Sequence, residues 1–69
     1  MSAMPLNIKK IKRLREDVGL SQAEAAAKAG LKTRQRWHQI ESGIITNIEL
    51  DTLERIAKAL GVKAKDLLK

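Results

Sequence analysis

The glycines of this chain divide it into short segments in which apolar residues recur at helical spacing. In the first segment Ile8, Ile11 and Leu14 stand three residues apart, and Val18 continues the same stripe. This spacing places them on one face of an α-helix. No segment shows the alternation of apolar and polar residues that is typical of a strand. The pattern therefore predicts an all-α fold, a compact domain of five helices over about residues 7–17, 21–29, 34–42, 50–60 and 62–68.

Capping signals indicate where these helices begin and end. Asn7 can cap the start of the first helix, and Gly19 can end it in a left-handed conformation. Ser21 and Glu24 match the capping box, in which a hydroxyl and a carboxylate satisfy each other's unpaired backbone donors. The helix that follows is rich in alanine. We therefore expect another helix to approach its backbone closely.

The size and composition of the chain limit how it can be stabilised. Its 69 residues include no cysteine and a single histidine, which excludes disulfides, thiolate zinc sites and histidine-rich metal sites. A chain of this length is near the lower limit for one hydrophobic core. We therefore expect a single domain over residues 7–69, preceded by a flexible segment over residues 1–6. Its core should be aliphatic around Trp37, and we expect no metal or other cofactor.

The apolar segments are too short for export or membrane insertion. No apolar stretch of about 7–15 residues follows the N-terminus, as a signal peptide would require. Nothing approaches the roughly 18 apolar residues of a membrane span. We expect a cytoplasmic protein with no membrane partner.

The positive charge is concentrated in one half of the chain. Residues 1–40 carry nine basic and three acidic side chains, whereas residues 41–69 carry five of each, which leaves the whole net charge of +6 in the first half. Such a field favours a polyanionic partner. A merely solubilising surface is the alternative that charge alone leaves open. Membrane association is less favoured, because the basic segments lack the bulky apolar face of an interfacial helix.

The third predicted helix has a polar face suited to hydrogen bonding. Trp37 and Ile40 are its only strongly apolar residues, so they should define its buried side. The side chains left facing outward, or on the flanks of that face, are Arg34, Gln35, Arg36, His38 and Gln39. Arginine pairs well with guanine and glutamine with adenine in the major groove of DNA. We therefore predict base readout by this face, against the alternative of an ordinary solvated helix surface.

The second and third helices are joined by a turn that contains Gly30 and is followed by the apolar Leu31, which is the helix-turn-helix arrangement. Further features at fixed spacing are Leu20–Glu24, Ala29–Leu31, Trp37, Ile40–Glu41 and Gly43, with Arg15 upstream and Thr52–Val62 downstream. On these residues the chain resembles the phage-repressor and Cro-like (XRE-type) helix-turn-helix family over about residues 7–68. The resemblance implies a lambda-repressor-like DNA-binding domain with its helix-turn-helix at helices 2 and 3. It also implies a sequence-specific transcriptional regulator, which we expect to be a repressor that binds double-stranded DNA as a homodimer.

The resemblance also implies roles for individual residues. It suggests base contacts by Arg34, Gln35 and Gln39. His38 lies on the same face and is added to this group. The phosphate contacts predicted around them are Ser21, Gln22, Lys32, Thr33 and Arg36. Ser21 is explained equally well as a plain helix cap. Lys9, Lys10 and Lys12 either approach the DNA backbone beside the site or belong to a solvated face.

Four residues are predicted to be structural. Trp37 and Ile40 should be buried, and Arg15 and Glu41 resemble a family pair that locks the first helix to the third. A charge-reversal swap of that pair should restore folding that either single change weakens.

Two departures from the family pattern affect these predictions. The distance from Gly30 to Trp37 is one residue longer than usual, with the extra residue at Lys32, and this could exchange the roles of Arg34 and Arg36. The loop over residues 43–48 has three isoleucines and no basic residue. We interpret that loop as a surface that meets another protein chain. Contact of its backbone amides and Thr46 with phosphate is the alternative.

A second class of function remains open beside DNA binding. The uncharged isoleucine loop favours a protein-interaction or antitoxin-like module that uses the helix-turn-helix as a scaffold. An enzyme is not expected, because the sequence offers no nucleophile–base pair, metal cluster or glycine-rich phosphate loop, and little room for a small-molecule substrate. RNA binding is disfavoured, because the only aromatic residue is predicted to be buried. The family suggests a bacterial or phage origin and association with the nucleoid.

Overall fold

The computed structural model describes residues 6–45 and 48–69 and contains four α-helices. These are α1 (Ile8–Val18), α2 (Gln22–Lys28), α3 (Arg34–Glu41) and α4 (Leu50–Leu60), followed by a 3-10 turn, η1 (Ala64–Leu67). The all-α class is confirmed, but the count of five helices is corrected, because the last segment is one 3-10 turn. Residues 1–5 of the predicted N-terminal segment and residues 46–47 of the isoleucine loop lie outside the described residues.

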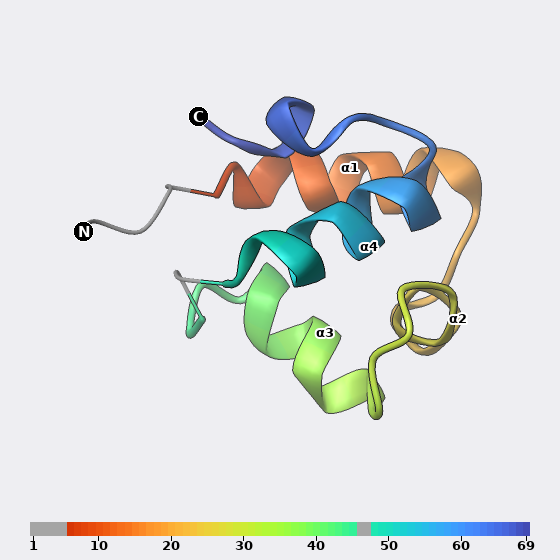
Figure 1. Cartoon of the computed structure of the whole chain (residues 1–69). Helices are drawn as coiled ribbons and strands as arrows, with labels where there is room; N and C mark the ends of the chain where they lie inside the picture. Colours follow the sequence, from red (N-terminus) through yellow and green to blue (C-terminus); the bar gives the residue numbers. More distant parts are fainter. Residues whose placement is uncertain (1–5, 46–47) are drawn as a thin grey trace.

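α1 packs against both α3 and α4, and α4 crosses the middle of the view in Figure 1. α2 packs against α3 and α4, and η1 lies over α1 and α4. The two ends of the fold meet, because Leu6 and Leu68 form an isolated antiparallel bridge and the amide of Asn7 donates to the carbonyl of Leu67 at 2.8 Å. Leu6 is 4% exposed. The packed part of the chain therefore includes the residue before the expected domain boundary at residue 7.

The predicted caps of α1 and α2 are confirmed. The Asn7 side chain accepts from the amide of Lys10 at 3.2 Å, and Gly19 ends α1 with a φ of +82°. Ser21 Oγ accepts from the amide of Glu24 at 3.0 Å, while the Glu24 carboxylate accepts from the amide of Ser21 at 2.9 Å. The backbone and hydroxyl of Ser21 lower the pKa of Glu24. The start of α2 is thus fixed by local hydrogen bonds.

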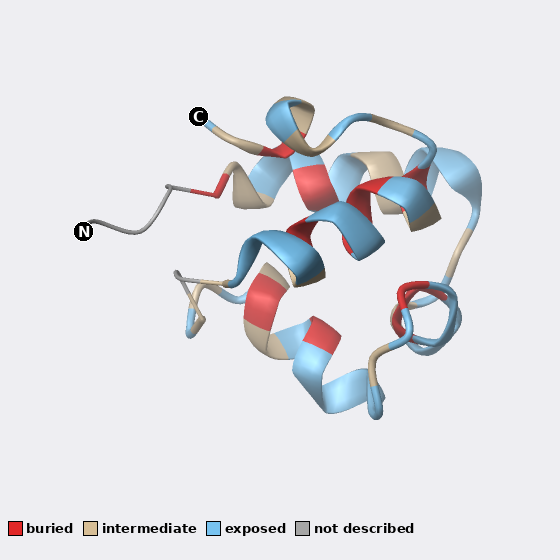
Figure 2. Cartoon of the chain, viewed as in Figure 1, coloured by how far each residue is buried: buried red, intermediate tan, exposed pale blue. Residues whose placement is uncertain are grey.

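The core lies where the apolar faces of the helices meet, and Figure 2 shows the buried segments facing the centre of the molecule. Its largest fully buried side chains are Ile11, Trp37, Ile40, Leu53, Ile56 and Leu67. Ala25 and Ala26 of α2, and Ala29 at its C-terminal cap, are at most 2% exposed. Val18, at the end of α1, departs from the predicted apolar stripe and is 48% exposed.

Candidate nucleic-acid interface

The turn between α2 and α3 is held by backbone and side-chain hydrogen bonds. Gly30 adopts a φ of +73°, and the amide of Leu31 donates to the carbonyl of Ala26 at 2.9 Å. Thr33 is the N-terminal cap of α3, and its hydroxyl accepts from the amide of Arg36 at 3.3 Å. The residue interpreted as extra, Lys32, lies exposed between them. The longer turn therefore leaves the start of α3 capped.

α3 has a buried side and an exposed side. Trp37 and Ile40 are fully buried. The residues of α3 that are exposed are Arg34, Gln35, Arg36 and His38. Gln39 is half-buried, and its carbonyl accepts from the amide of Ile45 at 3.1 Å, where the chain turns away from the helix. Four of the five polar residues predicted to face outward are therefore freely accessible.

A surface hollow, here called the recognition hollow, lies between the start of α2 and the exposed side of α3. It is lined by Gln22, Arg34, Gln35 and His38. Every lining side chain carries hydrogen-bonding groups, and arginine and glutamine can each form two hydrogen bonds to one base edge. The hollow therefore brings together three of the four residues predicted to contact bases, and Gln39 is not among its lining residues.

The other flank of α3 carries a second group of polar residues. Lys32, Thr33 and Arg36 line a separate hollow together with Gly30 and Leu31. Two of these are cations, which suits a negatively charged neighbour. Arg34 and Arg36 thus lie on different flanks of α3, Arg34 with the glutamines and Arg36 with Lys32.

Glu41 joins three helices through its carboxylate. Arg15 of α1 donates to it from Nε at 2.6 Å and from Nη2 at 3.1 Å, and Gln22 of α2 donates at 3.2 Å. The indole N–H of Trp37, in α3 itself, is the third donor. The side chains of Arg15 and Glu41 are only 11% and 4% exposed. The third Arg15 side-chain nitrogen, Nη1, donates to the carbonyl of Leu20 at 2.8 Å, which also fixes the chain before α2.

The electrostatics of this cluster keep Glu41 ionised. Burial favours the neutral acid and raises its pKa, but hydrogen bonds from Arg15, Trp37 and Gln22 outweigh burial and hold the pKa of Glu41 below its ordinary value. The hydrogen bond to Glu41 in turn raises the pKa of Arg15. The pair therefore stays charged near neutral pH and positions α3 relative to α1.

Sequence reasoning missed two of the donors to Glu41. Trp37 precedes Glu41 by four residues in one helix, which places the two side chains on the same face, and a buried indole N–H needs an acceptor. That spacing was therefore a usable signal. The donation from Gln22 depends on how α2 packs against α3, and no local pattern indicates it. Gln22 is held in place at the edge of the recognition hollow by this bond.

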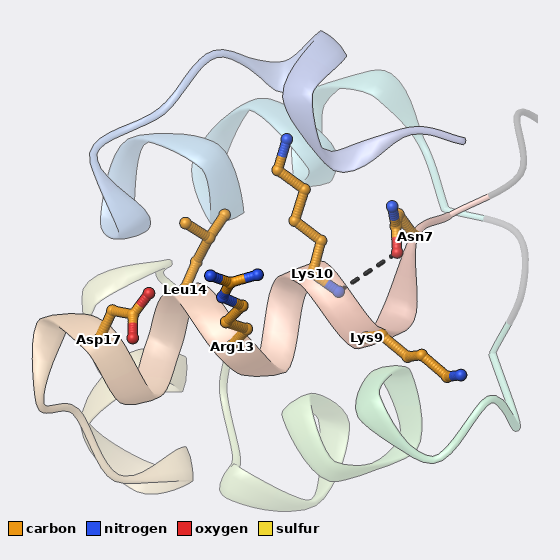
Figure 3. Close-up of a pocket in the computed structure, with 6 residues that line it drawn as sticks. All are labelled: Asn7, Lys9, Lys10, Arg13, Leu14 and Asp17. Atoms are coloured by element: carbon orange, nitrogen blue, oxygen red, sulfur yellow. Dashed lines mark hydrogen bonds between the residues drawn. The ribbon is translucent and has the colours of Figure 1, made fainter.

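The lysines of α1 lie in two different places. Lys12 lines a hollow with Gln22, His38, Glu41 and Ser42. Lys9 and Lys10 instead line a hollow along α1 together with Asn7, Arg13, Leu14 and Asp17, shown in Figure 3. The structure therefore separates Lys12 from its two neighbours and brings it to α2 and α3.

The isoleucine loop is less exposed than the sequence suggested. Ile44 is 71% exposed, but Ile45 and Ile48 are half-buried and pack against the core. Leu50, at the start of α4, is 55% exposed. The apolar surface near this loop thus rests on Ile44 and Leu50, and the interpretation of all three isoleucines as a contact surface is corrected.

The described part of the chain has neither a cluster of metal ligands nor a membrane-spanning helix. Within residues 6–45 and 48–69, no three histidine, aspartate or glutamate side chains gather as metal ligands would. Among the helices described, none is both long and apolar enough to cross a membrane.

The sequence and the fold both have recognisable relatives. Residues 11–67 match the family model described as Helix-turn-helix. No curated protein sequence matches the chain. Its fold is similar to that of a SinR protein/SinI protein complex, with 32% identity and a TM-score of 0.81, covering 90% of this chain and 59% of that chain. The present chain thus spans 59% of the length of that relative.

Two further structures are similar over most of their own length. One is described as the master regulator for biofilm formation SinR in complex with DNA, with 31% identity and a TM-score of 0.78, covering 84% of this chain and 93% of that one. The other is the restriction-modification controller protein C.AhdI from Aeromonas hydrophila, with 30% identity and a TM-score of 0.80. This similarity covers 88% of this chain and 89% of that one.

Proposed function

This chain belongs to the XRE-type, Cro-like helix-turn-helix family, and from that membership we propose that it is a DNA-binding transcription regulator. The observation that carries the proposal is the recognition hollow. Gln22, held by Glu41, stands there beside the exposed Arg34, Gln35 and His38. Hydrogen-bonding side chains on an exposed helix face are suited to the edges of bases in the major groove.

We assign base contacts to Arg34, Gln35 and His38, because these side chains share one accessible hollow. Gln39 is given a secondary role at the edge of the interface, because it is half-buried. The position of Arg34 beside the glutamines, with Arg36 on the other flank, supports base readout by Arg34 and not by Arg36.

The phosphate contacts are assigned to residues around the base contacts. They are Lys32, Thr33 and Arg36 on the other flank of α3, Ser21 at the N-terminal cap of α2, and Gln22, which lines the recognition hollow itself. Such contacts fix the register of a protein on the duplex, whereas the base contacts supply sequence information.

The finer proposal is a repressor that acts by occupying a promoter as a two-fold dimer in the cytoplasm, over half-sites about one helical turn apart. The exposed apolar side chains Ile44 and Leu50 support a contact with a second copy of the chain. One of the similar structures contains a regulator in complex with DNA, which supports the DNA-binding part of the proposal. No catalytic step is proposed.

The test begins with an amide chemical-shift titration of the labelled protein with a generic DNA duplex, at low and then raised salt. Shifts at Ser21, Gln22 and residues 32–39 that weaken with salt would support the proposal, since displaced counterions make DNA binding salt-dependent. Shifts confined to Ile44 and Leu50 would contradict it and favour a protein-interaction module.

A matched pair of variants then tests the base contacts. Arg34→Ala should cost about 1–3 kcal/mol at a site selected from random duplexes and should relax its specificity. Arg13→Ala removes the same side chain and charge from the exposed side of α1. Arg13→Ala should reduce the affinity for all DNA sequences slightly and by the same factor. Equal losses and unchanged specificity in both variants would remove Arg34 from base readout.

A further inference from the structure

Lys12 lies in a second hollow that continues the recognition hollow toward α1. This α1-side hollow is lined by Lys12, Gln22, His38, Glu41 and Ser42. Two of its lining residues, Gln22 and His38, also line the recognition hollow. The two hollows therefore adjoin, so Lys12 lies next to the face of α3 that is assigned to DNA.

The charge that Lys12 brings to this hollow is not cancelled by its neighbours. Glu41 is the acid that lines it, but its carboxylate is 4% exposed and accepts from Arg15, Gln22 and Trp37. The ion pair with Arg15 compensates its charge. Among the described residues Lys12 forms no ion pair. An accessible ammonium thus faces a hollow whose acid is already neutralised.

The sequence also explains why a cation is needed at this position. The loop over residues 43–48 that follows α3 contains no lysine or arginine. Phosphates that pass the C-terminal half of α3 therefore receive no positive charge from that loop. Lys12 reaches the same half of α3 from α1, as its shared hollow with His38 and Ser42 shows.

We propose that the α1-side hollow binds one backbone phosphate of DNA, and that Lys12 supplies the charge that holds it. The ammonium has three donors and no fixed plane, which suits a phosphate oxygen approached from any side. The contact positions the duplex and reads no base. This inference rests on the proposed function, because it concerns the same bound DNA.

The experiment compares Lys12→Gln with Lys10→Gln. Both residues are exposed on α1, so both variants lose one charge and keep a good helix former. In Figure 3 the Lys10 side chain projects toward the C-terminal segment, on the side of α1 away from α3. Charges separated by more than about 10 Å are largely screened at 0.1 M salt. Lys10→Gln therefore controls for the change in net charge.

Affinity for a fixed duplex is measured between 50 mM and 200 mM monovalent salt for the wild type and both variants. Loss of one phosphate contact should reduce the slope of log affinity against log salt by about 0.9, which corresponds to about eightfold weaker binding at 0.1 M salt. We expect this for Lys12→Gln, with the same loss on unrelated duplexes. Lys10→Gln should leave the slope unchanged, and Lys12→Arg should restore it.

The possible failures are distinguishable. A wild type whose affinity for DNA does not fall with salt overturns the proposed function and this site with it. A wild type that binds as expected, with equal slopes in Lys12→Gln and Lys10→Gln, overturns the phosphate site alone. Far-ultraviolet circular dichroism checks that both variants are folded. If Lys12→Gln is unfolded, the comparison rests on Lys12→Arg and on Lys12→Met, and a Met variant with the wild-type slope overturns the site.

Discussion

Glu41→Gln removes a charge from the point where α1, α2 and α3 meet and keeps the size and shape of the side chain. The partner left behind is Arg15, whose side chain is only 11% exposed. Removing one member of a fully buried ion pair costs about 3–5 kcal/mol, because the other charge stays buried without compensation. Arg15 keeps its bond to the carbonyl of Leu20. We therefore expect a somewhat smaller loss, about 2–4 kcal/mol.

That loss is large for this domain. At roughly 0.05–0.15 kcal/mol per residue, a chain of 69 residues has a total stability of about 3–10 kcal/mol. The melting temperature of so small a domain falls by about 4–8 °C per kcal/mol. Glu41→Gln should therefore melt at least about 8 °C below the wild type.

Urea denaturation at pH 7, followed by circular dichroism at 222 nm, measures this effect. The control is Glu54→Gln, which removes the same charge from an exposed position of α4 and should change stability by less than about 0.5 kcal/mol. If the two variants unfold at the same urea concentration, the structural role of Glu41 is refuted.

The dependence on pH tests the ionic part of the same reasoning. The pKa of Glu41 is depressed in the folded protein from its ordinary value of 4.5. The stabilisation of the fold by ionised Glu41 is therefore fully present above about pH 4.5, and it is lost as the pH falls through the pKa of the folded state. Glutamine does not titrate, so the stability gap between wild type and Glu41→Gln should narrow below pH 4.5. An equal gap at pH 3 and pH 7 would show that the charge of Glu41 is not responsible.

Two further substitutions probe the core and the start of α2. Trp37→Ala should lower the free energy of unfolding by about 3–5 kcal/mol, because the indole is fully buried and donates to Glu41. Circular dichroism should then show a largely unfolded domain. A folded variant that had lost only DNA binding would contradict the assignment of the buried side of α3. In urea denaturation, Ser21→Ala should lower the free energy of unfolding by about 1 kcal/mol and Ser21→Gly by only a few tenths. Both variants lose the hydroxyl cap, but glycine is favourable at the N-cap position. Equal losses in the two variants would argue against this capping effect.

The structure limits one expectation drawn from the sequence alone. A charge-reversal swap of Arg15 and Glu41 restores folding only if the two residues pair with each other alone. Glu41 also accepts from Trp37 and Gln22. An arginine at position 41 has no acceptor to offer these donors. Recovery by the double mutant should therefore be incomplete.

Features that depend on residues close in sequence were predictable. The capping box of Ser21 and Glu24 joins residues three apart, and the buried side of α3 follows from Trp37 and Ile40 at helical spacing. The last segment, expected as a fifth helix over residues 62–68, is a shorter 3-10 helix over Ala64–Leu67.

Features that depend on packing between distant residues were not predictable in the same way. The burial of Leu6 requires its pairing with Leu68, at the other end of the chain. The burial of Ile45 depends on how the loop returns over the core after α3. The placement of Lys12 beside His38 depends on how α1 packs on α3. In each case the sequence supplied suitable residues, and the tertiary fold selected among them.

The pairing of Leu6 with Leu68 has a consequence for how this domain can be joined to other chains. Its two ends leave the fold at one place, where the start of α1 meets η1, and α2 lies on the opposite side of the view in Figure 1. A domain with adjacent ends can be inserted into a loop of a host protein without stretching either connection. The host would then be attached away from the recognition hollow, and the domain would serve as a DNA-binding module with two tethers.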